Sequence, residues 1–430
     1  MPKLAPSSVT LFTYQVGFGD CFLLRFSYPD RDRHVLIDFG STAAGLTGAD
    51  PMTRIAKDIE QKVRATKGGT LDAIVVTHRH QDHISGFGAK KPWAVLNGLK
   101  PALVVQPWTE HPRAAVNATT GVKGQALREG HLATLDAMQA LSADALVELK
   151  RRKGGLDEEA GEARPFAMRT TDTLRFIGED NLKNASAVKN LMSIAKREYL
   201  SFGQPTSLER VLPGVKVHVL GPPTVDEAET ITSYAKQSQE YWSFAAGAAR
   251  HAASGKRLFP RAKTRPLKDA ELELHWFMKR LDAARGEQLL QLVRHLDDVM
   301  NNTSLILLFE ACGKKLLFPG DAQVENWAYA LSKPKVRALL EGVDLYKVGH
   351  HGSLNATPRT LWGLFSKKKK KGLVTVLSTK TGKHGHAQSG TEVPRKTLLE
   401  TLKKESELVS TQRFEGVTGI KGVAGEKKVS

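Results

Sequence analysis

Cysteine is scarce in this 430-residue sequence, which contains only Cys21 and Cys312. Two cysteines are too few for a disulfide framework, so we expect a cytoplasmic protein. Long hydrophobic runs are absent too, because no stretch approaches the roughly 18 to 20 apolar residues of a membrane span. Residues 1–6 lack the apolar segment of a signal peptide, and no Gly-rich nucleotide loop is evident. Secreted, membrane-spanning and P-loop proteins are therefore not expected.

The composition is that of a globular protein, with 41% apolar and 25% charged residues. The net charge of +18 indicates an anionic partner. Residues 367–430 contain 15 basic and 6 acidic residues, so half of the net charge lies in this segment. The five consecutive lysines at 367–371 are typical of a solvated loop, and we expect them on the edge of the molecule opposite the active site.

One short stretch organises the chain. Residues 73–77 form a buried, β-branched strand in this interpretation, and His78, His80, Asp82 and His83 follow it directly. Residues two apart in an extended segment project to the same side, so His78 and His80 can bind one cation. Asp82 and His83 are then placed for a second cation nearby. Imidazole and carboxylate groups suit zinc, manganese and iron.

Other segments support a family resemblance when they are read together with this stretch: residues 15–20, 36–40, 301–307, 318–321, 347–353 and 385–386. The chain resembles the metallo-β-lactamase superfamily. Within it, the Gly-His-His-Gly-Ser and Asn-x-Ser-Leu elements resemble the hydrolase domain of ComEC/Rec2-type DNA-uptake proteins and their free-standing relatives. The resemblance implies an α/β fold, a four-layer αββα sandwich, with a dinuclear metal site at the strand-end edge.

The same resemblance implies the ligands of the two cations. His78 and His80 belong to the first, Asp82 and His83 to the second, and Asp321 bridges both. Strand order suggests His386 as the terminal ligand of the second cation, with His350 or His351 as proton donor or phosphate contact. These two assignments could be exchanged. The catalytic candidates are therefore His350, His351 and Asp82.

Two further positions are implied to support the ligands. Asp38 closes a strand where the superfamily has an aspartate that braces the metal-binding loop. Asn302 stands where the superfamily often has a third histidine for the first cation. This replacement leaves fewer soft ligands, so we favour Mn²⁺, with Zn²⁺ or Mg²⁺ as alternatives.

We interpret residues 1–430 as a single domain with two helical insertions, at about 112–210 and 224–299. The proposed activity is that of a dinuclear phosphodiesterase or nuclease that uses a metal-bridging hydroxide, with nucleic acid as the expected partner. One alternative is a small-molecule hydrolase of the same fold, acting on a lactone, thioester, phosphorylcholine or cyclic-nucleotide ester. Another is a non-catalytic binding component of a multi-protein DNA-handling or defence system. The sequence leaves a protein partner and the oligomeric state open.

Overall fold

The computed structural model describes ten parts of the chain: residues 4–42, 50–111, 184–194, 196–224, 227, 300–353, 355–365, 372–383, 392–412 and 424–429. The predicted insertion at about 112–210 lies mostly outside these ranges, and the insertion at about 224–299 lies almost entirely outside them. The lysine run at 367–371 lies wholly outside them. His386 lies outside them as well.

The first β-sheet has seven strands in the order β13-β1-β2-β3-β4-β5-β6. Neighbouring strands are antiparallel from β13 to β3 and parallel from β3 to β6. The strands are β1 (Ser8–Tyr14), β2 (Cys21–Ser27), β3 (Arg33–Phe39), β4 (Ala73–Val75), β5 (Val104–Pro107), β6 (Arg197–Leu200) and β13 (Ala424–Val429).

The second sheet has six strands in the order β12-β11-β10-β9-β8-β7. Its β7 to β9 portion is antiparallel, and its β9 to β12 portion is parallel. The strands are β7 (Lys216–Gly221), β8 (Ile306–Ala311), β9 (Lys314–Phe318), β10 (Leu345–Lys347), β11 (Val374–Leu377) and β12 (Glu407–Ser410).

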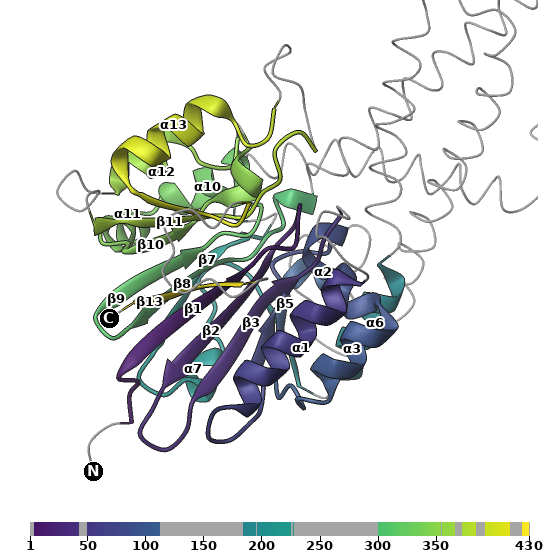
Figure 1. Ribbon diagram of the computed structural model, residues 1–430. Helices are drawn as coiled ribbons and strands as arrows, with labels where there is room; N and C mark the ends of the chain where they lie inside the picture. The colour runs from purple at the N-terminus through teal and green to yellow at the C-terminus, as the bar shows by residue number, and fades with distance from the viewer. Residues whose placement is uncertain are drawn as a thin grey trace, which may run out of the picture.

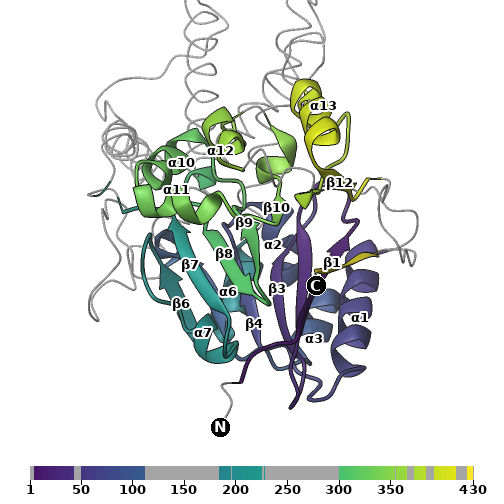
Figure 2. The same cartoon turned by 90° about the vertical axis from the view of Figure 1, so that its left-hand side faces the viewer.

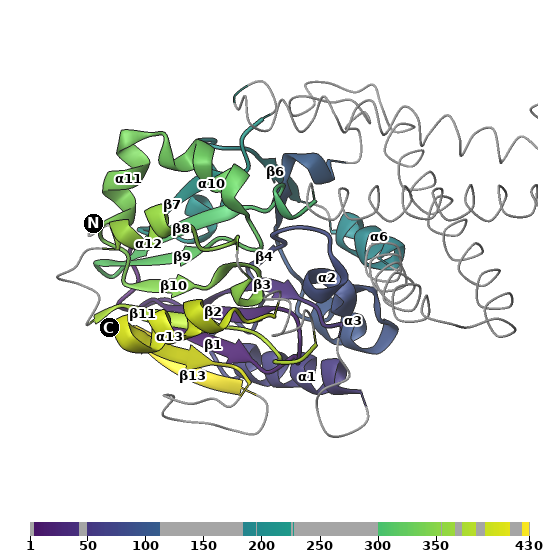
Figure 3. The same cartoon turned by 90° about the horizontal axis from the view of Figure 1, so that it is seen from above.

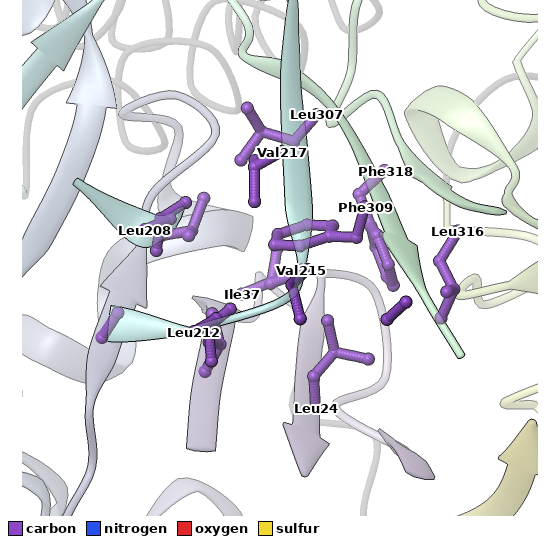
Figure 4. Packing of buried hydrophobic residues seen from close by; sticks show 14 of the residues in the cluster. Leu24, Ile37, Leu208, Leu212, Val215, Val217, Leu307, Phe309, Leu316 and Phe318 are labelled. Carbon is purple, nitrogen blue, oxygen red and sulfur yellow. The ribbon is translucent and has the colours of Figure 1, made fainter. Parts of the chain in front are cut away.

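The two sheets pack face to face around one apolar core (Figure 4). Alternate residues of each strand point into this space, so Leu24 and Ile37 of the first sheet meet Phe309 and Phe318 of the second. All four side chains are buried, and burying each one stabilises the fold by roughly 1.5–3 kcal/mol. The short helix α7 (Leu208–Val211) adds Leu208 to the same core.

Helices cover the outer face of each sheet (Figures 1 and 2). On the first sheet they are α1 (Pro51–Arg64), α2 (Gln81–Gly88), α3 (Lys90–Asn97) and α6 (Ala185–Ser193); on the second they are α10 (Val324–Leu331), α11 (Pro334–Leu340), α12 (Arg359–Leu364) and α13 (Lys396–Glu405). The predicted amphipathic α1 buries Ile55, Ile59 and Val63. The four layers confirm the αββα sandwich, and Figure 3 shows them from above.

The predicted insertion at about 112–210 contains sheet elements in its last part. Residues 197–200 form β6, which pairs in parallel with β5, and the preceding α6 packs beside α2. The single-domain interpretation itself stays a prediction. Sequence pattern gave no strand here because β6 is only four residues long and begins with the charged residues Arg197 and Glu198.

The parallel strands place their carboxyl ends at one edge of the sandwich. The segments that follow β4, β9 and β10 carry the predicted ligands, and β3 carries Asp38 next to its last residue. Two glycines allow a close approach at this edge. A Cβ atom on Gly40 would lie 2.4 Å from the backbone nitrogen of His83, and one on Gly19 would lie 2.6 Å from the carbonyl oxygen of Asp82.

We expect Gly40→Ala to lower the free energy of unfolding by about 1–3 kcal/mol, because the new methyl group must displace the backbone of the His-rich loop. The matched control is Gly363→Ala on α12, where an added Cβ meets nothing within 4 Å. The control should be neutral or stabilise by up to about 1 kcal/mol. Urea unfolding midpoints measure both variants, and a wild-type midpoint for Gly40→Ala would contradict the close approach.

Candidate metal centre

The His-rich loop leaves β4 and turns directly into helix α2. His80 is the residue before the helix, and its carbonyl oxygen accepts hydrogen bonds from the backbone nitrogens of His83 at 2.9 Å and Ile84 at 3.0 Å. Asp82 and His83 therefore lie in the first turn of α2, whereas His78 and His80 lie on the segment before it. Four residues that are close in the sequence therefore also place their side chains close together in space.

Three imidazole rings of this loop lie against one another. The His78 ring centroid is 4.1 Å from that of His83 and 4.6 Å from that of His80. Burial lowers the pKa of His78 well below its ordinary value, and it lowers the pKa of His80 to about 4. Both are therefore neutral near pH 7. The Nε2 atom of His78 is buried and has no hydrogen-bond partner, which is the state required of a metal ligand.

A second group joins the loop to the opposite sheet. Asp82, His83, Asp321 and His351 each offer a ligand atom, and these atoms lie within 4.8 Å of one another. The Oδ2 oxygen of Asp321 is 3.1 Å from Nε2 of His83 and 3.4 Å from Nε2 of His351. Nε2 of His351 is also 2.9 Å from Oδ2 of Asp82. Two imidazoles and two carboxylates in this arrangement match the ligands that zinc and manganese accept.

Neighbouring groups orient the two histidines of this group. Nδ1 of His83 is 2.8 Å from Oδ2 of Asp38, and Nδ1 of His351 is 3.0 Å from the carbonyl oxygen of Ser378. An acceptor at Nδ1 leaves Nε2 as the ligand atom of each ring. Thr77 in turn donates to both oxygens of Asp38, from its backbone nitrogen and its hydroxyl group. Asp38, which was predicted to brace the metal-binding loop, thus contacts the His83 ring of that loop.

The centre concentrates negative charge in a buried place. Asp20, Asp38, Asp82 and Asp321 surround it, and Lys347 is the lysine within it. Burial opposes the ionisation of Asp321, but His83, His351 and Lys347 outweigh it and hold its pKa well below the usual value. Burial also opposes a charged His83, yet Asp321, Asp82 and Asp38 raise its pKa. When its imidazoles are neutral, as ligands of a cation must be, the described centre has four carboxylates and one ammonium group, and divalent cations would balance the remaining negative charge.

The backbone is strained where it presents the paired histidines. His350 has φ 41° and His351 has φ 52°, both in the left-handed region that residues other than glycine rarely adopt. They form the turn η3 (Gly349–Gly352) that follows β10. Such a conformation costs about 1–3 kcal/mol per residue and persists when the surroundings hold it. Here it turns His351 into the centre, fully buried, while His350 stays 26% exposed with Nε2 3.9 Å from Oδ2 of Asp321.

The structure brings together most of the residues predicted from the sequence: His78, His80, Asp82, His83, Asp321, His350, His351 and Asp38. His386 lies outside the described residues. The amide nitrogen of Asn302 donates to Glu325 on α10 at 3.0 Å. Its role in supporting the metal ligands stays a prediction.

Sequence reasoning missed three residues of the centre: Asp20, Thr77 and Lys347. Lys347 lies in a strand that is otherwise apolar and is 1% exposed. A charged side chain in such a strand is the signal that could have found it, because lysine is almost never buried without a partner. Asp20 follows Gly19 in the turn between β1 and β2, and its backbone nitrogen donates to the carbonyl oxygen of Asp82 at 2.9 Å.

Comparison with known families agrees with this geometry. Residues 14–144 match the profile of the metallo-beta-lactamase superfamily, a range that includes the whole His-rich loop. This part of the chain is therefore a metallo-β-lactamase superfamily domain, and the αββα architecture and the buried His and Asp groups are those of that class. No curated protein matches the sequence. Among the described residues, no helix has the length and apolar character needed to span a membrane.

Arg79 ties the His-rich loop to its surroundings from between His78 and His80. Its guanidinium group donates from Nε to both oxygens of Glu110, at 2.9 and 2.8 Å, and both side chains are buried. Glu110 ends the turn η1 (Trp108–Glu110) after β5. The carbonyl oxygen of Arg79 accepts a hydrogen bond from the side-chain nitrogen of Asn184 at 2.8 Å. The loop is thus fixed through its central residue.

We expect Glu110→Gln to lower the free energy of unfolding by about 3 kcal/mol, because it leaves the buried Arg79 charge without its counter-charge. Glu60→Gln is the matched control, since Glu60 pairs with Arg64 on the surface of α1. That exposed pair should contribute no more than about 0.5 kcal/mol. Urea unfolding measures both changes. Equal effects of the two substitutions would show that the buried pair is not a structural anchor.

Proposed function

We propose that this chain is a dinuclear metal-dependent phosphodiesterase whose substrate is nucleic acid. The observation that supports the metal dependence is the group of four aspartates and several histidines, in which Asp82, His83, Asp321 and His351 place ligand atoms within 4.8 Å of one another. His78, His80 and Asp321 would hold one divalent cation, and Asp82, His83, Asp321 and His351 would hold the other. When bound, such ions lower the pKa of a water molecule and offset charge on phosphoryl oxygens.

His351 is better suited to bind a cation than to contact substrate. It is fully buried, its Nδ1 atom is engaged by Ser378, and its Nε2 atom faces Asp82 and Asp321. His350 differs, because a quarter of its side chain is exposed while Nε2 stays 3.9 Å from Asp321. In this proposal His350 contacts the phosphate or gives a proton to the leaving oxygen. The assignment of His386 as a terminal ligand stays a prediction.

The choice of substrate rests on charge and on resemblance. A net charge of +18 is more than a small anionic substrate needs, and the motifs after β10 and before β8 resemble those of ComEC/Rec2-type hydrolases. The same charge is why we place a nucleic-acid substrate ahead of the small-molecule hydrolase. We favour Mn²⁺ over Zn²⁺ and Mg²⁺ because the ligand set combines carboxylates with imidazoles.

We expect His351→Ala and His350→Ala to have different effects. His351→Ala should lower both metal content and turnover of a generic phosphodiester, because it removes a ligand. His350→Ala should keep wild-type metal content and lose about 10²- to 10⁴-fold in turnover, the range for a proton donor. Elemental analysis and a colorimetric phosphodiester assay give the two readouts. His218→Ala is the control, since His218 on β7 pairs with Glu310 on β8. Normal metal content in His351→Ala would contradict its ligand role.

We expect nucleic acid to bind largely by charge, so that affinity falls linearly in a log–log plot against salt. A slope of magnitude roughly 3 or more on single-stranded DNA would indicate at least about four phosphate contacts. Metal-loaded His350→Ala is the protein to use, because the substrate then survives the measurement. Single-stranded DNA, duplex DNA, RNA and a cyclic dinucleotide should be compared. A flat salt response, with turnover of the cyclic dinucleotide alone, would favour the small-molecule hydrolase.

A further inference from the structure

Lys347 is a buried cation that belongs to the centre itself. It is the last residue of β10, and its side chain is 1% exposed. Its Nζ atom donates to the carbonyl oxygen of Gly320 at 3.0 Å, lies 3.3 Å from Oδ1 of Asp321 and forms its shortest contact with Oδ2 of Asp20. An ammonium group has three hydrogens, so these three acceptors use all of them. Lys347 therefore has no donor left for a substrate.

The contact with Lys347 divides the two oxygens of Asp321 between different partners. Oδ1 faces the ammonium group, whereas Oδ2 faces Nε2 of His83 at 3.1 Å and Nε2 of His351 at 3.4 Å. The backbone nitrogen of Asp321 donates to the hydroxyl group of Ser304 at 3.2 Å, which fixes the start of this side chain. The carboxylate is thus held so that one oxygen points to the ligand group.

Asp20 is the other carboxylate that Lys347 contacts, and it lies near the Nδ1 atoms of two proposed ligands. Its Oδ1 atom is 3.6 Å from Nδ1 of His351, and its Oδ2 atom is 3.7 Å from Nδ1 of His83. Asp20, Asp38 and His83 have ligand atoms within 4.8 Å of one another, as a cation site would. The ammonium group of Lys347 contacts Asp20, so the protein itself supplies a positive charge to this group of ligand atoms.

We propose that Lys347 is a positioning residue that serves as a fixed cation of the centre: it neutralises Asp20 and holds Oδ1 of Asp321, so that Oδ2 alone is presented to the divalent ions. This inference rests on the proposed metal dependence. It has a specific consequence for Asp20. If Asp20 is neutralised by substitution, the charge of Lys347 is shared with Asp321 alone, and the carboxylate becomes a poorer ligand.

The test is a double-mutant cycle with Asp20→Asn, Lys347→Met and the combined variant. Lys315→Met is the matched control, because Lys315 is a half-buried strand lysine whose Nζ atom donates only to the carbonyl oxygen of Leu339 among its described contacts. Each full-length protein is measured twice. The first measurement is the melting temperature without metal, and the second is the affinity for Mn²⁺ and Zn²⁺ by calorimetric titration.

We expect Lys347→Met to lower the melting temperature without metal, because Asp20 and Asp321 lose their counter-charge. Adding Asp20→Asn should raise it again, because the combination removes a charge together with its counter-charge. Asp20→Asn should weaken Mn²⁺ binding by about 10- to 100-fold, the range for residues behind metal ligands. Adding Lys347→Met to it should restore most of that loss. Lys315→Met should leave affinity at the wild-type value.

Two results would overturn the inference. In one, the combined variant melts no higher than Lys347→Met alone, which would make Lys347 a packing residue. In the other, Asp20→Asn binds Mn²⁺ as the wild type does. A wild type that binds neither Mn²⁺ nor Zn²⁺ would instead remove the proposed function, and the melting cycle would still decide whether Lys347 neutralises Asp20. If either single variant fails to fold, folding of the combined variant supports the inference and its failure overturns it.

Discussion

The repulsion among four carboxylates at one buried edge is the constraint on which this structure depends. Asp20, Asp38, Asp82 and Asp321 come from four separate segments, and each would cost several kcal/mol to bury as an isolated charge. The chain offsets part of this cost itself. Lys347 contacts two of the carboxylates, the Thr77 hydroxyl group and backbone nitrogen donate to a third, and imidazoles lie against all four. The clustered carboxylates and imidazoles of this edge are groups that could hold divalent cations.

The topology explains how these groups meet. Parallel strands in both sheets end at the same edge, so segments distant in sequence deliver their first polar residues to one place. The backbone adapts at a few positions to complete the contact. Asp38, His350 and His351 adopt left-handed conformations, and Gly19 and Gly40 allow the turns beneath the His-rich loop to approach its backbone. The core between the sheets is apolar and continuous. The strain at the edge is therefore supported by burial elsewhere in the sandwich.

The sequence reveals those parts of the centre that depend on local spacing, and it misses those that depend on long-range pairing. His78, His80, Asp82 and His83 could be found because they lie within six residues directly after a strand. The segment was expected to stay extended, whereas α2 begins at Gln81. Asp321, His350 and His351 could be found only through family resemblance, since nothing local relates them to the loop. Lys347 and Asp20 escaped both routes. The burial of a lysine at the end of a strand depends on which strands flank it, and that pairing is a property of the whole fold. Strand β6 was missed for the same reason, because its place in the sheet is set by pairing with β5 and not by its own pattern.

The His-rich loop is also joined to the part of the chain that follows β5. Arg79, between two histidines of the loop, pairs with Glu110, which stands at the end of the turn after β5, and its carbonyl oxygen is bound by Asn184, which directly precedes α6. Glu110 and Asn184 are therefore both bound to the residue that separates His78 from His80. A displacement of either anchor acts on the backbone of the loop, because a buried bidentate ion pair has few alternative arrangements. In the proposed assignment, substitution of Glu110 or Asn184 would displace ligands of the first cation, His78 and His80, whereas substitution of Asp38 would displace His83, a ligand of the second. Both proposed cations would share Asp321, but different residues position their other ligands.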